Sequence, residues 1–199
     1  MRNDQLINQD SGNVEYYTPP EIMNCVREMF PVIELDPASC RTANKTVDAK
    51  KIFTKVGNGL NKKWKANTVW LNHPFSKGEK ACKENCKKKA CIDKNYSKYR
   101  GHCISEDIPS NLDWINKLLE EFNTGHFNES LNITFVNSSE LWCQKLLAAG
   151  KSCFITGRTN FLDSNGTQTS GAPKGCFITY LGNRTGDFER IFSKIGVVK

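Results

Sequence analysis

Apolar residues recur along the chain with two periods, one typical of helices and the other typical of strands. Residues 110–122 have the clearest helical period, and residues 18–29 repeat it after a Thr-Pro-Pro start that favours a helix terminus. Short apolar runs predict strands at Val32–Leu35 and Thr68–Leu71. Further strands are predicted at residues 49–54, 131–137, 152–157 and 176–182, and further helices at residues 139–150 and 187–196.

This alternation of strands and helices predicts an α/β fold with a largely parallel sheet, whose last strands pair antiparallel at one edge. A chain of 199 residues has the length of one domain. We expect residues 1–13 to form a flexible arm and residues 14–199 to form the domain, interrupted by an insertion at residues 77–107.

The chain contains neither a long apolar stretch nor an apolar N-terminal segment that would form a signal peptide. The sequence therefore predicts a cytoplasmic protein without a membrane span. In that compartment nine cysteines do not indicate a disulfide framework. No feature of the sequence predicts an oligomeric state.

Polar residues follow two of the predicted strands at their carboxyl ends, where open α/β sheets bind ligands. Asp36 follows the first strand and Asn72 follows the strand at residues 68–71. The Asn72 side chain and the main-chain carbonyl of His73, kept extended by Pro74, offer two acceptors for an amine. Phe75 offers a face on which a flat base can stack. The alternative is that these residues only cap local turns.

Four cysteines are clustered in the insertion with the spacing C-x3-C-x4-C-x11-C. Four thiolates are the ligand set of a structural zinc site, and the insertion has little apolar content with which to fold. His102 could replace one sulfur, and the alternative is a lysine-rich insertion whose cysteines are incidental. The predicted zinc ligands are Cys82, Cys86, Cys91 and Cys103.

The net charge of +7 indicates a polyanionic partner. Between Lys77 and Cys103 nine basic residues face three acidic ones, a local excess of +6. Such residues contact phosphates without reading sequence. The predicted DNA-contacting residues are Lys83, Lys87, Lys88, Lys89 and Arg100 of the insertion, with Arg158 after a later strand.

The tetrapeptide Asn72-His73-Pro74-Phe75 resembles the Asn/Asp-Pro-Pro-Tyr/Phe motif of the amino-methyltransferases. The ordered segments YYTPPEI, IELDPAS, NGL and VWLNHPF, with Trp64 before the last of them, resemble the phage-type DNA N6-adenine methyltransferase (phage Dam-like) family from about Tyr16 to the end of the chain.

This resemblance implies a Rossmann-like methyltransferase that transfers a methyl group from S-adenosylmethionine to the N6 amine of adenine in DNA, for which the base is flipped out of a duplex. Methylation in phage relatives suggests protection of phage DNA from restriction. The implied catalytic residues are Asn72, His73, Pro74 and Phe75. The implied cofactor-binding residues are Tyr17, Thr18, Pro19, Asp36, Pro37, Ser39, Asn58 and Leu60.

Two departures from the usual pattern leave alternatives open. His73 stands in place of the first proline of the motif, and the loop after the first strand contains no glycine. An inactive, zinc-stabilised nucleic-acid-binding protein on a methyltransferase fold would explain both departures. An amino-methyltransferase that acts on RNA is a further alternative, because the basic residues do not distinguish RNA from DNA.

Overall fold

The computed structural model describes residues 16–93, 101–163 and 165–199. The predicted N-terminal arm therefore lies outside the described residues. The helices are α2 (Pro20–Met29), α3 (Arg41–Val47), α4 (Lys89–Ile92), α5 (Asn111–Asn123), α6 (Leu141–Ala149) and α7 (Thr185–Phe192), with a 3-10 turn η1 (Gly59–Asn61). The strands are β1 (Leu35–Asp36), β2 (Lys51–Ile52), β3 (Thr68–Leu71), β4 (Lys77–Glu79), β5 (Ile108–Ser110), β6 (Glu129–Phe135), β7 (Lys151–Ile155), β8 (Cys176–Leu181) and β9 (Gly196–Val198).

Within the described part of the chain, seven strands form one sheet in the order β2-β1-β3-β6-β8-β7-β9. The first four are mutually parallel, whereas β8 runs antiparallel to β6 and β7, and β9 runs antiparallel to β7. The predicted α/β class, the parallel sheet and the antiparallel edge are confirmed. No helix in the described ranges is long and apolar enough to cross a bilayer.

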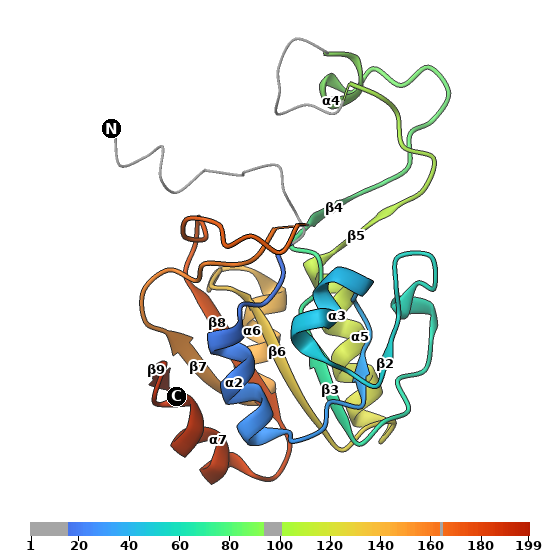
Figure 1. Cartoon of the computed structure of the whole chain (residues 1–199). Coiled ribbons are helices and arrows are strands. Elements are labelled where there is room, and N and C mark those ends of the chain that lie inside the picture. Colours follow the sequence, from blue (N-terminus) through green and yellow to red (C-terminus); the bar gives the residue numbers. More distant parts are fainter. Residues whose placement is uncertain (1–15, 94–100, 164) are drawn as a thin grey trace.

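Helices cover both faces of this sheet (Figure 1). Residues of α2 and α7 form one hydrophobic core, and residues of α5 and α6 form the other. The alternation along β3 explains this division, because Trp70 enters the first core while Val69 and Leu71 enter the second. All three side chains are fully buried, so β3 lies at the centre of the domain.

Several predicted boundaries differ from the observed ones. The first strand covers Leu35 and Asp36, rather than Val32–Leu35. The prediction of a helix to residue 196 was wrong, because α7 ends at Phe192 and the chain returns as β9. At Gly196 a Cβ atom would lie 2.2 Å from the carbonyl oxygen of Phe154, so only glycine allows β9 to pair this closely with β7.

Residues 77–110, which we call the cysteine arm, leave the sheet after β3 and return to the start of α5. The ribbon of β4 and β5 projects beyond the carboxyl ends of the parallel strands and carries α4 at its far end (Figure 1). Two hydrogen bonds fasten its base, from Asn111 N–H to the Ser76 carbonyl and from Ser76 N–H to Asn111 Oδ1. The base of the arm is therefore fixed a few residues after Asn72, which directly follows β3.

Candidate active site

A cavity of about 600 Å³ opens at the carboxyl ends of β1, β2 and β3. Its volume lies within the usual range for small-molecule sites. Most of its walls come from the segments that the sequence singled out. The lining includes residues 16–18, 36–40, 53–55, 58–59, 72–74 and 102–109, together with Ala43, Val47, Ser76 and Trp114.

Asn72 directly follows β3 and reaches this cavity. Its Nδ2 donates to the carbonyl oxygen of Tyr16 at 2.5 Å and to the Thr18 hydroxyl at 3.0 Å. Both donor hydrogens of the amide are thereby used inside the protein. The remaining group of the side chain, Oδ1, is an acceptor. The segment before α2 thus orients Asn72 for accepting a hydrogen bond.

His73 lines the cavity but is buried, with its imidazole ring parallel to that of Trp114 at a centroid distance of 6.3 Å. Nδ1 lies 3.1 Å from the Pro74 carbonyl, and Nε2 has no partner among the described residues. Burial lowers the pKa of His73 to about 4, although the Pro74 carbonyl opposes this effect. The ring is therefore neutral at neutral pH and behaves as a core side chain.

Phe75 packs into an aromatic group, with its ring 5.7 Å from that of Tyr16 and 4.4 Å from that of Phe135. Phe161 closes the same group at 6.0 Å from Phe75. The described lining of the cavity does not include Phe75. The aromatic position of the motif therefore lies beside the cavity, where it supports Tyr16, a residue of the wall.

Asp36 is buried at the tip of β1 and accepts a hydrogen bond from the N–H of Ala38. Burial raises the pKa of its carboxyl to about 7, against the opposing hydrogen bonds from Ala38 and Ser39. A carboxyl held at this point changes charge near neutral pH. It can match a cationic group of a ligand in the cavity.

The Asn-Gly-Leu segment has a steric basis. A Cβ atom at Gly59 would lie 2.0 Å from the Pro37 carbonyl oxygen, so glycine lets this loop pack directly against the Asp36 loop. The Gly59 carbonyl accepts a hydrogen bond from Trp64 Nε1 at 2.8 Å. Asn58, with φ of 42°, caps the turn through Leu60 N–H. Asn58 lines the cavity, whereas Leu60 lines a neighbouring cavity of about 670 Å³, and Pro19 caps α2 without contributing to the lining.

The four clustered cysteines meet at the far end of the arm, with all their Sγ atoms within 4.8 Å of one another. Cys91 Sγ lies 3.6 Å from Cys82 Sγ and 3.7 Å from Cys86 Sγ. The N–H of Ile104 donates to Cys82 Sγ and is the main cause that lowers the pKa of this thiol to about 6. Such a sulfur is a good metal ligand.

The family model described as DNA N-6-adenine-methyltransferase (Dam) matches residues 8–195. The chain belongs to this family. The comparisons with curated proteins and with solved structures gave no match. Membership confirms the family that the sequence resembles, and the family name supports a DNA adenine methyltransferase.

In this Dam-family chain the described residues predicted to contact DNA lie on two parts of the surface. Lys83, Lys87, Lys88 and Lys89 are exposed on the arm, where Lys88 forms an ion pair with Glu79 at 3.1 Å. Arg158 is exposed after β7, on a different part of the fold. Arg100 lies outside the described residues.

A second basic segment of the Dam-family chain was missed by the sequence analysis. Between Arg41 and Lys65 there are eight basic residues and a single acidic one, Asp48, a net charge of +7. All eight are exposed, and none forms an ion pair with a described carboxylate. A sliding count of charge along the whole chain would have revealed this segment.

Proposed function

We propose that this protein transfers a methyl group from S-adenosylmethionine to the N6 amine of adenine in DNA. The observation that carries the proposal is the orientation of Asn72 at the tip of β3. Both its N–H groups are used by Tyr16 and Thr18, and its oxygen is left as an acceptor at the cavity. Family membership supports the same reaction.

Adenine N6 is a poor nucleophile, because its lone pair is delocalised into the ring. We infer that Asn72 Oδ1 and the His73 carbonyl accept hydrogen bonds from the two N–H groups of the amine and thereby draw its lone pair out of conjugation with the ring. As the N–CH3 bond forms and the S–CH3 bond breaks, positive charge that develops on nitrogen would be stabilised by two fixed oxygens. S-adenosylhomocysteine would then leave, and one N6 proton would pass to solvent. The role of His73 rests on its main chain, since its buried neutral ring has no acid-base part in this scheme.

The cavity suits the cofactor in volume and in chemistry. S-adenosylmethionine supplies a methyl group on a cationic sulfonium and carries an ammonium group. In this proposal Asp36 faces the cationic part, and Tyr17, Thr18, Pro37, Ser39 and Asn58 form further walls. Phe75 supports the base-binding side through its contact with Tyr16 rather than from the cavity wall.

The four cysteines suit a structural zinc ion. A tetrahedral site with Zn–S bonds of about 2.3 Å places its sulfur atoms about 3.8 Å apart. The separations of 3.6 and 3.7 Å from Cys91 Sγ approach this value, and the cluster contains four sulfurs. Metal analysis of purified protein tests the assignment, and we expect one zinc ion per chain. An arm that stays folded in metal-free protein would refute the assignment.

Methyl transfer from labelled S-adenosylmethionine to mixed-sequence duplex DNA tests the reaction, with nucleosides identified by mass spectrometry. We expect N6-methyladenine from the parent protein and a loss of at least about 100-fold in rate for Asn72→Ala, the usual effect of removing one preorganised group. Asn128→Ala is the matched control, because Asn128 is exposed at the amino end of β6 and bonds only Asn67 in the described structure.

A product on RNA alone, or equal rates for Asn72→Ala and the parent, would contradict the proposal. Protection from restriction stays a prediction. Digestion of the methylated DNA with restriction enzymes whose sites contain adenine would test it.

A further inference from the structure

The exposed basic residues between Arg41 and Lys65, which we call the basic edge, begin in α3 and pass along β2 and η1. This segment carries +7, the cysteine-containing segment from Lys77 to Cys103 carries +6, and the rest of the chain carries −6, with eleven basic and seventeen acidic residues. Charge is therefore segregated in this protein. Solubility alone does not require such segregation, so the basic edge calls for a partner.

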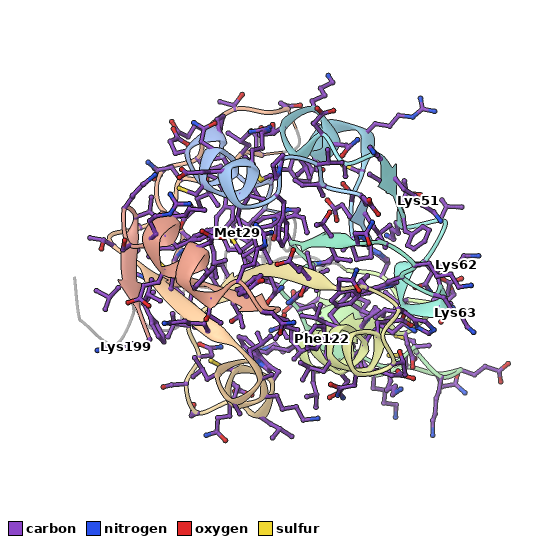
Figure 2. The ribbon with its side chains drawn as sticks, turned by 90° about the horizontal axis from the view of Figure 1, so that it is seen from below. Met29, Lys51, Lys62, Lys63, Phe122 and Lys199 are labelled. Carbon is purple, nitrogen blue, oxygen red and sulfur yellow. The ribbon has the colours of Figure 1, made fainter. Side chains whose placement is uncertain are left out.

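The charge of two lysines in the basic edge has an explanation other than a partner. Lys50 precedes β2 and Lys51 belongs to it, and β2 is the outermost strand of the sheet, where lysines prevent edge-to-edge pairing with other molecules. Lys62, Lys63 and Lys65 lie outside β2, so protection of the sheet edge does not explain their charge. Figure 2 shows Lys51, Lys62 and Lys63 along one edge of the molecule, on the side away from Lys199.

The lysines at residues 62–65 are held on a firmly fixed backbone. Trp64, between them, is fully buried, and its Nε1 bonds the Gly59 carbonyl. The N–H of Trp64 donates to Glu121 at 2.7 Å, and this buried carboxylate is also paired with Lys117 at 2.6 Å. Since the backbone is already ordered, binding through these lysines costs mainly side-chain entropy.

The basic edge reaches the candidate active site. Lys55 and Asn58, on the loop between β2 and η1, line the cavity that also contains Asn72. The returning limb of the cysteine arm, residues 102–109, lines the same cavity. A nucleotide whose base enters this cavity brings its flanking phosphates close to both segments.

We propose that the basic edge binds the phosphate backbone of DNA whose base enters the cavity, which the basic edge reaches at Lys55 and the cysteine arm reaches at residues 102–109. The inference rests on the proposed function for the identity of the polyanion. Exposed lysines without ion pairs release counterions when they contact phosphates, so each contact adds to the salt dependence of binding.

The test measures the affinity for fluorescent duplex DNA by anisotropy over a series of salt concentrations. The variant carries Lys62→Gln, Lys63→Gln and Lys65→Gln. Its matched control carries Lys145→Gln, Lys194→Gln and Lys199→Gln, the same charge change outside the basic edge. We expect the slope of log K against log salt to fall by about 3 in the first variant, roughly 1 per lysine, and to change little in the control.

Equal slopes for the two variants, absent DNA binding by the parent, or a loss confined to RNA binding would overturn the inference. S-adenosylmethionine affinity and the unfolding midpoint, measured on both variants, identify any loss that comes from misfolding. Methylation by the parent separates the two proposals. If the parent methylates DNA but the variant at Lys62, Lys63 and Lys65 keeps the parental salt slope, only the proposed role of the basic edge is refuted. If the salt slope of the variant falls but the parent does not methylate DNA, only the proposed enzymatic function is refuted.

Discussion

The cysteine arm and the basic edge are both strongly basic in the sequence, with net charges of +4 and +7, yet the structure supports their backbones in different ways. In the arm, Lys80 pairs with Asp107 at 2.6 Å and Lys88 pairs with Glu79, and the fold converges on four sulfurs. In the basic edge no ion pair forms with a described carboxylate, and Trp64 anchors the backbone in the hydrophobic core. Two basic segments can therefore differ both in rigidity and in the availability of their lysines to a partner.

The contrast has a physical cause. The arm buries little apolar surface, with Cys91 its single buried hydrophobic residue among those described. A segment of this kind depends on an added source of folding free energy. The basic edge instead shares the burial of the sheet, so its lysines stay in place without a metal. Four predictions separate the two regions further, beginning with the largest expected effect.

Loss of the metal site should unfold the arm and spare the sheet. Structural zinc contributes about 10–16 kcal/mol of binding free energy in small zinc-dependent folds. We expect Cys91→Ser, or treatment with a chelator, to make residues 77–107 sensitive to proteases while the far-UV circular dichroism of the domain changes little. Cys176→Ala, at a buried cysteine of β8, is the contrasting control and should lower the unfolding midpoint without exposing the arm. Unchanged cleavage of Cys91→Ser would show that the cysteines do not hold the arm.

The loop that links the basic edge to the cavity should depend on Gly59. Gly59→Ala places a Cβ atom 2.0 Å from the Pro37 carbonyl oxygen. We expect a loss of about 1–3 kcal/mol in the free energy of unfolding, typical of overpacking, together with weaker cofactor binding in calorimetry. Gly57→Ala is the matched control, because its nearest contact would be an ordinary 3.5 Å. Equal stability of the two variants would contradict the close packing of this loop.

Lysines of the arm should contribute to DNA binding only while the arm is folded. Lys83→Gln with Lys87→Gln should reduce the salt slope by about 2 in zinc-replete protein. After chelation the Lys83 and Lys87 variant should have the same salt slope as the parent, whereas substitution of Lys62, Lys63 and Lys65 should still reduce the salt slope. Anisotropy with and without chelator measures both. Persistence of the arm effect in metal-free protein would remove the distinction between the two regions.

The last prediction concerns the cavity that both regions reach. The pKa of Asp36 is raised by burial to about 7, above its ordinary 3.8, so the ligand-free protein should lose stability as pH rises between these values. A cationic ligand favours the ionised carboxyl. Affinity for S-adenosylmethionine should therefore rise up to about tenfold per pH unit as pH approaches 7 from below. Asp36→Asn should flatten this profile, and an unchanged profile would exclude Asp36 from cofactor binding.

The sequence by itself determined the α/β class, the strand that leads into Asn72 and the cysteine spacing. These features are local: an apolar period sets the element, and a proline or glycine sets its end. Family resemblance was equally visible in the order of the short segments. The boundaries of the two-residue strands β1 and β2 were less clear, because so short a strand has no period of its own.

Only the tertiary structure decided which residues share the cavity. Asn72 obtains its orientation from Tyr16 and Thr18, 56 and 54 residues away in the chain. Phe75 packs into an aromatic group, although it was expected to offer a stacking face for a base, and the His73 ring is buried against Trp114. α7 ends at Phe192 rather than at residue 196, and the chain then pairs with β7 as β9, a contact that outweighs local propensity. These outcomes depend on contacts between distant segments, which a local pattern does not encode.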